Sequence, residues 1–170
     1  MGYTLPATIG ASFAKDELIV GVSGDGSVMM NIQDMATLAF HNRNIKLFIM
    51  NNNGYSSIRQ LQNSSFRGRL IGCDSNSGLG MPDFEKVIKA FGLQYARLEG
   101  SDNLPQKIAN VWAIEGCVVC EVMCETEQEF LMVTTAMNSK RRMVMRPLED
   151  QAPFLDRDVF NSEMIIEPLD

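Results

Sequence analysis

The sequence is poor in several residue types on which whole classes of protein depend. Its 170 residues include one histidine, one tryptophan and six prolines, and contain no internal repeat. No apolar run is long enough to span a bilayer, and no targeting segment is recognisable, so we expect a soluble, cytoplasmic protein. A chain of this length needs no disulfide scaffold. Three of its four cysteines cluster in an apolar run, so we expect reduced thiols in the core.

Basic side chains are also in the minority. Fifteen Lys and Arg residues against twenty-one Asp and Glu residues give a net charge of −6, which repels nucleic acids and anionic membranes. We therefore expect neither as a partner. Any phosphate-bearing ligand has to be bound by a local site rather than by the overall field of the protein.

Hydrophobic periodicity predicts an α/β fold. Near-continuous apolar runs, typical of buried parallel strands, occupy residues 18–23, 45–51, 94–98 and 117–122. Helical patterns alternate with them at residues 5–14, 29–41, 83–91 and 104–114. This alternation predicts a doubly wound parallel sheet in three layers, with helices on both faces. The second helix is apolar almost all round and is expected to be buried between the sheet and a second surface, which can lie outside this chain.

Two regions interrupt the alternation. Residues 63–80 are rich in Ser, Asn and Gly without a period, which predicts a long loop. We place one domain at residues 1–135 and an extended C-terminal tail, packed on its own or a neighbouring domain, at residues 136–170. The tail carries large apolar side chains that we expect to be buried: Phe154, Leu155, Phe160, Ile165 and Ile166.

The most informative motif is Gly24-Asp25-Gly26-Ser27, directly after the first apolar strand. Ligands of open α/β sheets bind beyond the carboxyl ends of strands, and a glycine-rich turn lets backbone N–H groups approach phosphate oxygens. A carboxylate in such a turn repels a diphosphate unless a cation lies between them. Asp25 therefore predicts a bridging Mg²⁺ ion.

The second strand ends in a complementary motif, Asn51-Asn52-Asn53-Gly54-Tyr55. If the first two strands are neighbours, their carboxyl ends meet at the same edge of the sheet. Mg²⁺ requires six oxygen ligands. The Asp25 and Asn52 side chains and the Gly54 carbonyl, completed by two phosphate oxygens and a water, would supply them.

These two motifs together resemble the fingerprint of thiamine diphosphate enzymes, and the flanking segments narrow the resemblance. Residues 1–11 (MGYTLPATIGA), residues 30–42 (MNIQDMATLAFHN) and residues 82–92 are similar to segments of the acetolactate synthase family. The likeness covers about residues 1–125. It extends only to the C-terminal, diphosphate-binding third of the large subunit of such an enzyme.

The resemblance implies thiamine diphosphate and Mg²⁺ as cofactors. Asp25, Asn52 and Gly54 match the metal ligands. The cofactor-binding positions that match the family are Met1, Gly24, Asp25, Gly26, Ser27, Met30, Asn52, Gly54 and Tyr55. The family's acceptor pocket carries a tryptophan where this chain has Leu61, and Ser57 and Ile58 also differ. These three positions are the candidate substrate pocket.

The resemblance also implies a function. The implied activity is decarboxylation or carboligation of a 2-oxo acid. In such enzymes the catalytic glutamate comes from a pyrimidine-binding domain of the same enzyme or of a partner subunit. No segment of this chain resembles that domain, so no catalytic residue is assigned here. We expect a fragment that is inactive alone and belongs to a homodimer or larger oligomer.

Two alternatives remain open at this stage. The chain could be the β-type subunit of a two-chain 2-oxo acid decarboxylase, or a non-catalytic interaction module that kept the fold. A metal site at Cys117, Cys120 and Cys124 is not favoured, because the first two point to opposite faces of an apolar strand. His41 is expected to lie near a helix end, without a catalytic role.

Overall fold

The structure of the chain is a computed structural model that describes residues 1–128, 135–137, 143–145, 147, 149–151 and 154–166. It divides into two compact units, Met1–Glu127 and Gln128–Asp170. In the described residues, no helix is both long enough and apolar enough to cross a membrane.

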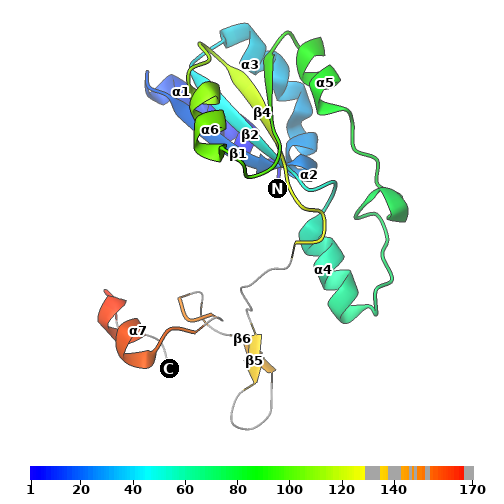
Figure 1. Cartoon of the computed structure of the whole chain (residues 1–170), viewed down its shortest axis with the longest axis vertical. Coiled ribbons are helices and arrows are strands. Elements are labelled where there is room, and N and C mark those ends of the chain that lie inside the picture. The colour runs from blue at the N-terminus through cyan, green and yellow to red at the C-terminus, as the bar shows by residue number, and fades with distance from the viewer. Residues whose placement is uncertain (129–134, 138–142, 146, 148, 152–153, 167–170) are drawn as a thin grey trace. The chain divides into compact units, whose positions relative to one another are not determined.

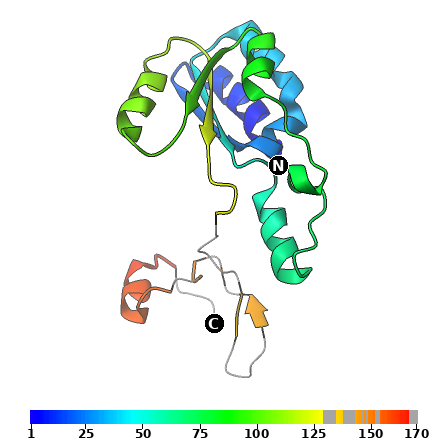
Figure 2. The same ribbon diagram turned by 45° about the vertical axis from the view of Figure 1, so that its right-hand side comes forward.

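A four-stranded, fully parallel sheet forms the centre of the first unit (Figures 1 and 2). Its strands are β1 (Ile19–Gly24), β2 (Ile45–Asn51), β3 (Gln94–Leu98) and β4 (Val118–Met123), in the spatial order β1-β2-β4-β3. Each begins and ends within one residue of a predicted strand. The prediction succeeds because the central strands β2 and β4 are buried on both faces and read as continuous apolar runs.

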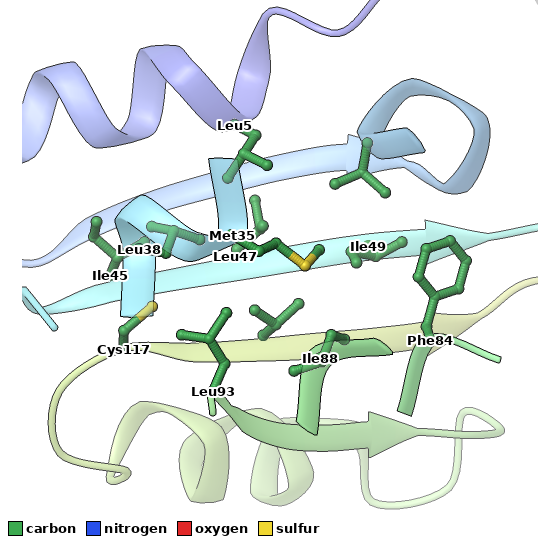
Figure 3. Close-up of a cluster of buried hydrophobic side chains, with 12 residues drawn as sticks. Leu5, Met35, Leu38, Ile45, Leu47, Ile49, Phe84, Ile88, Leu93 and Cys117 are labelled. Atoms are coloured by element: carbon green, nitrogen blue, oxygen red, sulfur yellow. The ribbon is translucent and has the colours of Figure 1, made fainter. Parts of the chain in front are cut away.

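Helices cover both faces of this sheet. One face packs against α1 (Thr4–Ala14), α2 (Asp25–Val28), η1 (Met29–Asp34), α3 (Met35–His41) and α5 (Phe84–Ala90); the other packs against α6 (Leu104–Trp112). Figure 3 shows the larger core, in which Leu5, Met35 and Leu38 lie against Leu47 and Ile49 of β2. The predicted three-layer α/β architecture is confirmed.

The segment after β1 differs from its prediction. Instead of one helix over residues 29–41, the chain enters α2 directly at Asp25 and continues through the 3-10 helix η1, where Asn31 departs from helical geometry. In this chain by itself Met30 is 50% exposed and Phe40 is 83% exposed, and the burial predicted for the segment against a partner outside this chain stays a prediction.

Helix α4 (Ser56–Ser65) was not predicted, and its last turn lies in the region expected to be a loop. Figures 1 and 2 show it extending away from the sheet. The remainder of that region, with the short 3-10 helix η2 (Ser75–Ser77), is irregular as expected.

The second unit has more regular structure than an extended tail. The strands β5 (Thr135–Met137) and β6 (Met143–Met145) pair antiparallel, and α7 (Arg157–Glu163) follows. Of the five apolar side chains predicted to be buried in the tail, Phe160 is buried, at 6% exposure. The other four, Phe154, Leu155, Ile165 and Ile166, are exposed in this chain by itself, and their expected burial against a domain stays a prediction.

Candidate functional site

The two predicted motifs meet at the carboxyl edge of the sheet. Strands β1 and β2 are parallel neighbours, with Gly24 in register with Met50, so the turn after each strand emerges at the same place. The Gly54 N–H donates to Asp25 Oδ2 at 2.9 Å, across 29 positions of sequence. The Gly26 N–H donates to the other carboxylate oxygen at 2.6 Å. Asp25 thus lies between the two motifs and holds them together.

The Asp25 carboxylate is nearly inaccessible to water, with 2% of the residue exposed. Burial raises the pKa of Asp25 above its ordinary value, and the N–H groups of Gly54 and Gly26 act in the opposite direction. Backbone N–H groups stabilise a carboxylate only through their dipoles. A buried anion held in this way is a natural ligand for a cation, which supplies the missing countercharge.

Asn52 presents a second oxygen at this edge. Its Nδ2 group donates to Ser56 Oγ at 3.2 Å, while its Oδ1 atom is buried and has no hydrogen-bond partner in the described part of the chain. Buried amide oxygens are nearly always satisfied, so an unmet one on the turn that contacts a buried carboxylate indicates a ligand. Mg²⁺ prefers carboxylate and amide oxygens, and the donor set therefore fits that ion.

Gly54 is held in a conformation that other residues rarely adopt. Its φ angle is +136°, and a Cβ atom built there would lie 2.2 Å from the carbonyl oxygen of Cys73. The next residue, Tyr55, donates its N–H to the same carbonyl at 2.9 Å. Close packing of two backbone segments requires glycine here, and it fixes the direction of the Gly54 peptide.

Tyr55 covers the glycine turn. A Cβ atom at Gly26 would lie 2.3 Å from Cε1 of the Tyr55 ring, so the ring lies directly against the backbone of Gly26. By contrast, a Cβ atom at Gly24 would meet nothing within 4 Å. The two glycines of the motif therefore differ: the second accommodates an aromatic ring, and the first faces open space.

The amino-terminal segment closes on the same turn. The Gly2 N–H donates to Ser27 Oγ at 2.9 Å, and the Asn31 side chain donates to the Gly2 carbonyl oxygen. A Cβ atom at Gly2 would lie 3.0 Å from Cβ of Met30, so the backbone of Gly2 lies against the Met30 side chain. Met1 is 72% exposed. Its predicted contact with the cofactor, like that of Met30, stays a prediction.

The predicted substrate-pocket residues all lie on α4. Ser57, Ile58 and Leu61 are exposed there, with Ile58 40% and Leu61 50% accessible. Ser56, in the first turn of the same helix, contacts Asn52. Helix α4 therefore connects the candidate pocket to the candidate metal ligand, while the assignment of the pocket itself stays a prediction.

Several residues that support this edge were not identified from the sequence. The Arg59 side chain, 3% exposed, donates to the Thr126 carbonyl and lies 3.9 Å from Asp74, next to the Cys73 carbonyl. The Asp74-to-Ser77 capping box was a detectable signal for this loop. Asn51 belongs to the second predicted motif but had no predicted role of its own, and Glu121 reads as one polar residue in an otherwise apolar strand.

The cysteines behave as core thiols. Cys117 belongs to the core on one face of the sheet and Cys120 to that on the other, and burial raises the pKa of each thiol to about 11. All four cysteines are free. Among the described residues no cluster of His, Cys, Asp and Glu could hold a metal. His41 is exposed in the last turn of α3.

Comparison with known proteins shows the family to which this chain is similar. Residues 1–122 match the family described as "Thiamine pyrophosphate enzyme, C-terminal TPP binding domain". The acetolactate synthase large subunit of Cyanidium caldarium is 32% identical over 145 residues, covering 85% of this chain and 24% of the relative. That of Porphyra purpurea is 35% identical over 136 residues, covering 78% and 22%. Acetolactate synthase 2, chloroplastic, of Nicotiana tabacum is 29% identical over 136 residues, covering 77% and 20%. The chain thus spans between a fifth and a quarter of the length of these relatives.

Proposed function

Because the chain belongs to the thiamine pyrophosphate enzymes through their C-terminal TPP binding domain, we propose that it binds thiamine diphosphate through a Mg²⁺ ion. The metal ligands are the side chains of Asp25 and Asn52 and the carbonyl of Gly54. The observation that carries this proposal is the buried Asn52 Oδ1, which lacks a hydrogen-bond partner in the described residues. The buried Asp25 carboxylate lies on the neighbouring turn.

The residues around the metal ligands have separate tasks. Gly24, Gly26 and Ser27 hold the diphosphate, with Gly24 leaving open space and Ser27 fixed by the Gly2 N–H. Tyr55 covers the turn and excludes water from it. Met1 and Met30, which are exposed at this edge, contact the remainder of the cofactor.

The activity we propose is decarboxylation or carboligation of a 2-oxo acid in an acetolactate synthase-like enzyme of the cytoplasm. Bound thiamine diphosphate supplies a nucleophilic carbon for addition to the substrate carbonyl. This chain binds and orients the cofactor, and Ser57, Ile58 and Leu61 of α4 shape the substrate pocket. The catalytic glutamate comes from a pyrimidine-binding domain of the same enzyme or of a partner subunit, in a homodimer or larger assembly. The described chain alone is therefore inactive.

Thermal unfolding of the 170-residue chain tests the binding proposal. We expect Mg²⁺ and thiamine diphosphate together to stabilise the chain and each alone to have little effect. When the cofactor concentration is ten times its dissociation constant, binding raises the free energy of unfolding by about 1.4 kcal/mol. This increase raises Tm by roughly 3–6 °C for a chain of this size. Asp25→Ala should abolish the shift. Asp16→Ala, which removes a fully exposed carboxylate, should retain it.

Two results would contradict parts of the proposal. No stabilisation at millimolar cofactor and metal would favour a non-catalytic interaction module of the same fold. Turnover of pyruvate or another 2-oxo acid by the purified chain would disprove the requirement for a separate pyrimidine-binding domain.

A further inference from the structure

Another buried carboxylate lies in the sheet, on the strand that neighbours β2. Glu121 of β4 is 4% exposed. It directly follows Val119 and Cys120, which belong to the cores on the two faces of the sheet. Its two oxygens have different partners: Oε1 accepts from Nδ2 of Asn51 at 2.6 Å, and Oε2 accepts from the Tyr95 hydroxyl. Burying a carboxylate in a sheet is costly unless it is hydrogen-bonded. The two bonds, together with Arg97 Nη1 at 3.8 Å from Oε2, explain how it is tolerated but not what it contributes.

The bond to Asn51 fixes an amide that has its own task. Asn51 is the last residue of β2, and its Oδ1 atom accepts the N–H of Asn53 at 2.9 Å. Asn53 has a φ angle of +59°, a left-handed conformation that needs local hydrogen bonding to be favoured. Because Glu121 accepts from the Nδ2 group, the Oδ1 atom of Asn51 is directed at that N–H. The amide of Asn51 therefore stabilises the turn that follows β2.

This turn carries two of the three proposed metal ligands. We propose that Glu121 is a positioning residue for the metal site: by orienting the Asn51 amide, it holds Asn53 in the turn that presents Asn52 Oδ1 and the Gly54 carbonyl. This inference rests on the proposed function for its metal, but the hydrogen-bonded chain Glu121–Asn51–Asn53 belongs to the protein alone.

Tyr95 supplies a matched control on the other side of the same carboxylate. Burial and the neighbouring Glu121 raise the pKa of the Tyr95 hydroxyl above its ordinary value, so it remains a donor. Tyr95→Phe removes one hydrogen bond from Glu121 but leaves the bond to Asn51. Glu121→Leu removes both bonds. In Glu121→Gln the amide oxygen can accept from Asn51, while its NH₂ group donates to the Tyr95 oxygen.

The first measurement is hydrogen exchange of the Asn53 amide in the ligand-free chain. We expect exchange about tenfold faster in Glu121→Leu and Asn51→Ala, because both release the acceptor of this N–H. Glu121→Gln and Tyr95→Phe should exchange like the wild type. Asn51→Ala leaves the Glu121–Tyr95 bond intact and keeps the test decisive if Glu121→Leu fails to fold. Unchanged Asn53 exchange in Asn51→Ala, or equal acceleration in Tyr95→Phe and Glu121→Leu, would overturn the proposal.

The second measurement is Mn²⁺ affinity in the presence of thiamine diphosphate, followed by electron paramagnetic resonance. Loss of a residue that orients a metal ligand typically weakens binding by about 10–100-fold. We expect such a loss in Glu121→Leu and Asn51→Ala and near-wild-type affinity in Glu121→Gln and Tyr95→Phe. Equal losses in Tyr95→Phe and Glu121→Leu would assign Glu121 a purely structural role. If the wild type binds no Mn²⁺, the proposed function fails, and the exchange measurement decides whether Glu121 positions the turn.

Discussion

Alanine substitution at the two glycines of the first motif should shift stability in opposite directions. Gly26 lies in α2, and alanine is favoured over glycine in helices by about 1 kcal/mol, so local propensity alone predicts that Gly26→Ala stabilises the chain. The Tyr55 ring reverses this expectation. The new Cβ atom would lie 2.3 Å from Cε1 of the ring, far inside ordinary contact distances, which begin at 3.4 Å.

The structure sets the size of the effect. The Tyr55 ring has to retreat by 3.4 − 2.3 = 1.1 Å to restore an ordinary contact. Overpacking of this kind costs about 1–3 kcal/mol. At Gly24 the added methyl group meets nothing within 4 Å, and φ is −76°. Gly24→Ala should therefore stabilise the ligand-free chain by about 0.4–1 kcal/mol, through the reduced entropy of the unfolded state.

Urea denaturation of the ligand-free variants, followed by circular dichroism, measures both effects. The double variant Gly26→Ala/Tyr55→Leu serves as the control, because removing the ring removes the clash. The double variant should be more stable than the two single changes in unfolding free energy, added together, would predict. The difference should be about 0.5 kcal/mol or more, the lower limit of the coupling seen between residues in contact. The reasoning is refuted if Gly26→Ala is as stable as Gly24→Ala, or if the double variant is additive.

Three further predictions concern residues outside this pair. Gly54→Ala should destabilise the chain by more than Gly26→Ala in the same urea assay, because its Cβ atom meets the rigid backbone carbonyl of Cys73 and its φ angle is positive. Burial lowers the pKa of Lys46 in the folded chain, so the unfolded chain binds more protons as the pH approaches 10.5 from below. In urea titrations between pH 7 and 10.5, the wild type should therefore gain stability relative to Lys46→Met, and a pH-independent difference would contradict this. Arg59→Met should destabilise the chain by about 3 kcal/mol, since it breaks a buried charged network. Arg43→Met, which removes a surface ion pair, should change the free energy of unfolding little.

The sequence predicted the parts of this molecule that follow from apolar patterning. Strands β2 and β4 are continuous apolar runs, and their bounds agree with the prediction to within one residue. The meeting of Asp25 with Gly54 followed from a rule of topology, that parallel neighbours end at the same edge. Neither prediction required knowledge of individual side-chain contacts.

The parts that escaped prediction depend on polar contacts between distant segments. Helix α4 has one buried residue, Arg59, which bonds across 67 positions to Thr126. No periodic apolar stripe announces such a helix. Glu121 likewise reads as one polar residue in an apolar strand, and its bond to Asn51 spans 70 positions. Helix α2 begins at Asp25, where glycine-rich composition predicts a turn.

Two groups at the carboxyl edge of the sheet oppose folding of the chain by itself. The Asn52 Oδ1 atom gives up its hydrogen bonds to water without replacement in the described residues, which costs about 1–3 kcal/mol for such a group. Burial likewise disfavours the charged form of Asp25. Under the proposed function, a cation bound by both side chains would remove both costs at once, so the contacts that weaken the isolated fold would strengthen metal binding. The proposed metal site would therefore account for the position of these two side chains, which the stability of the sheet does not explain.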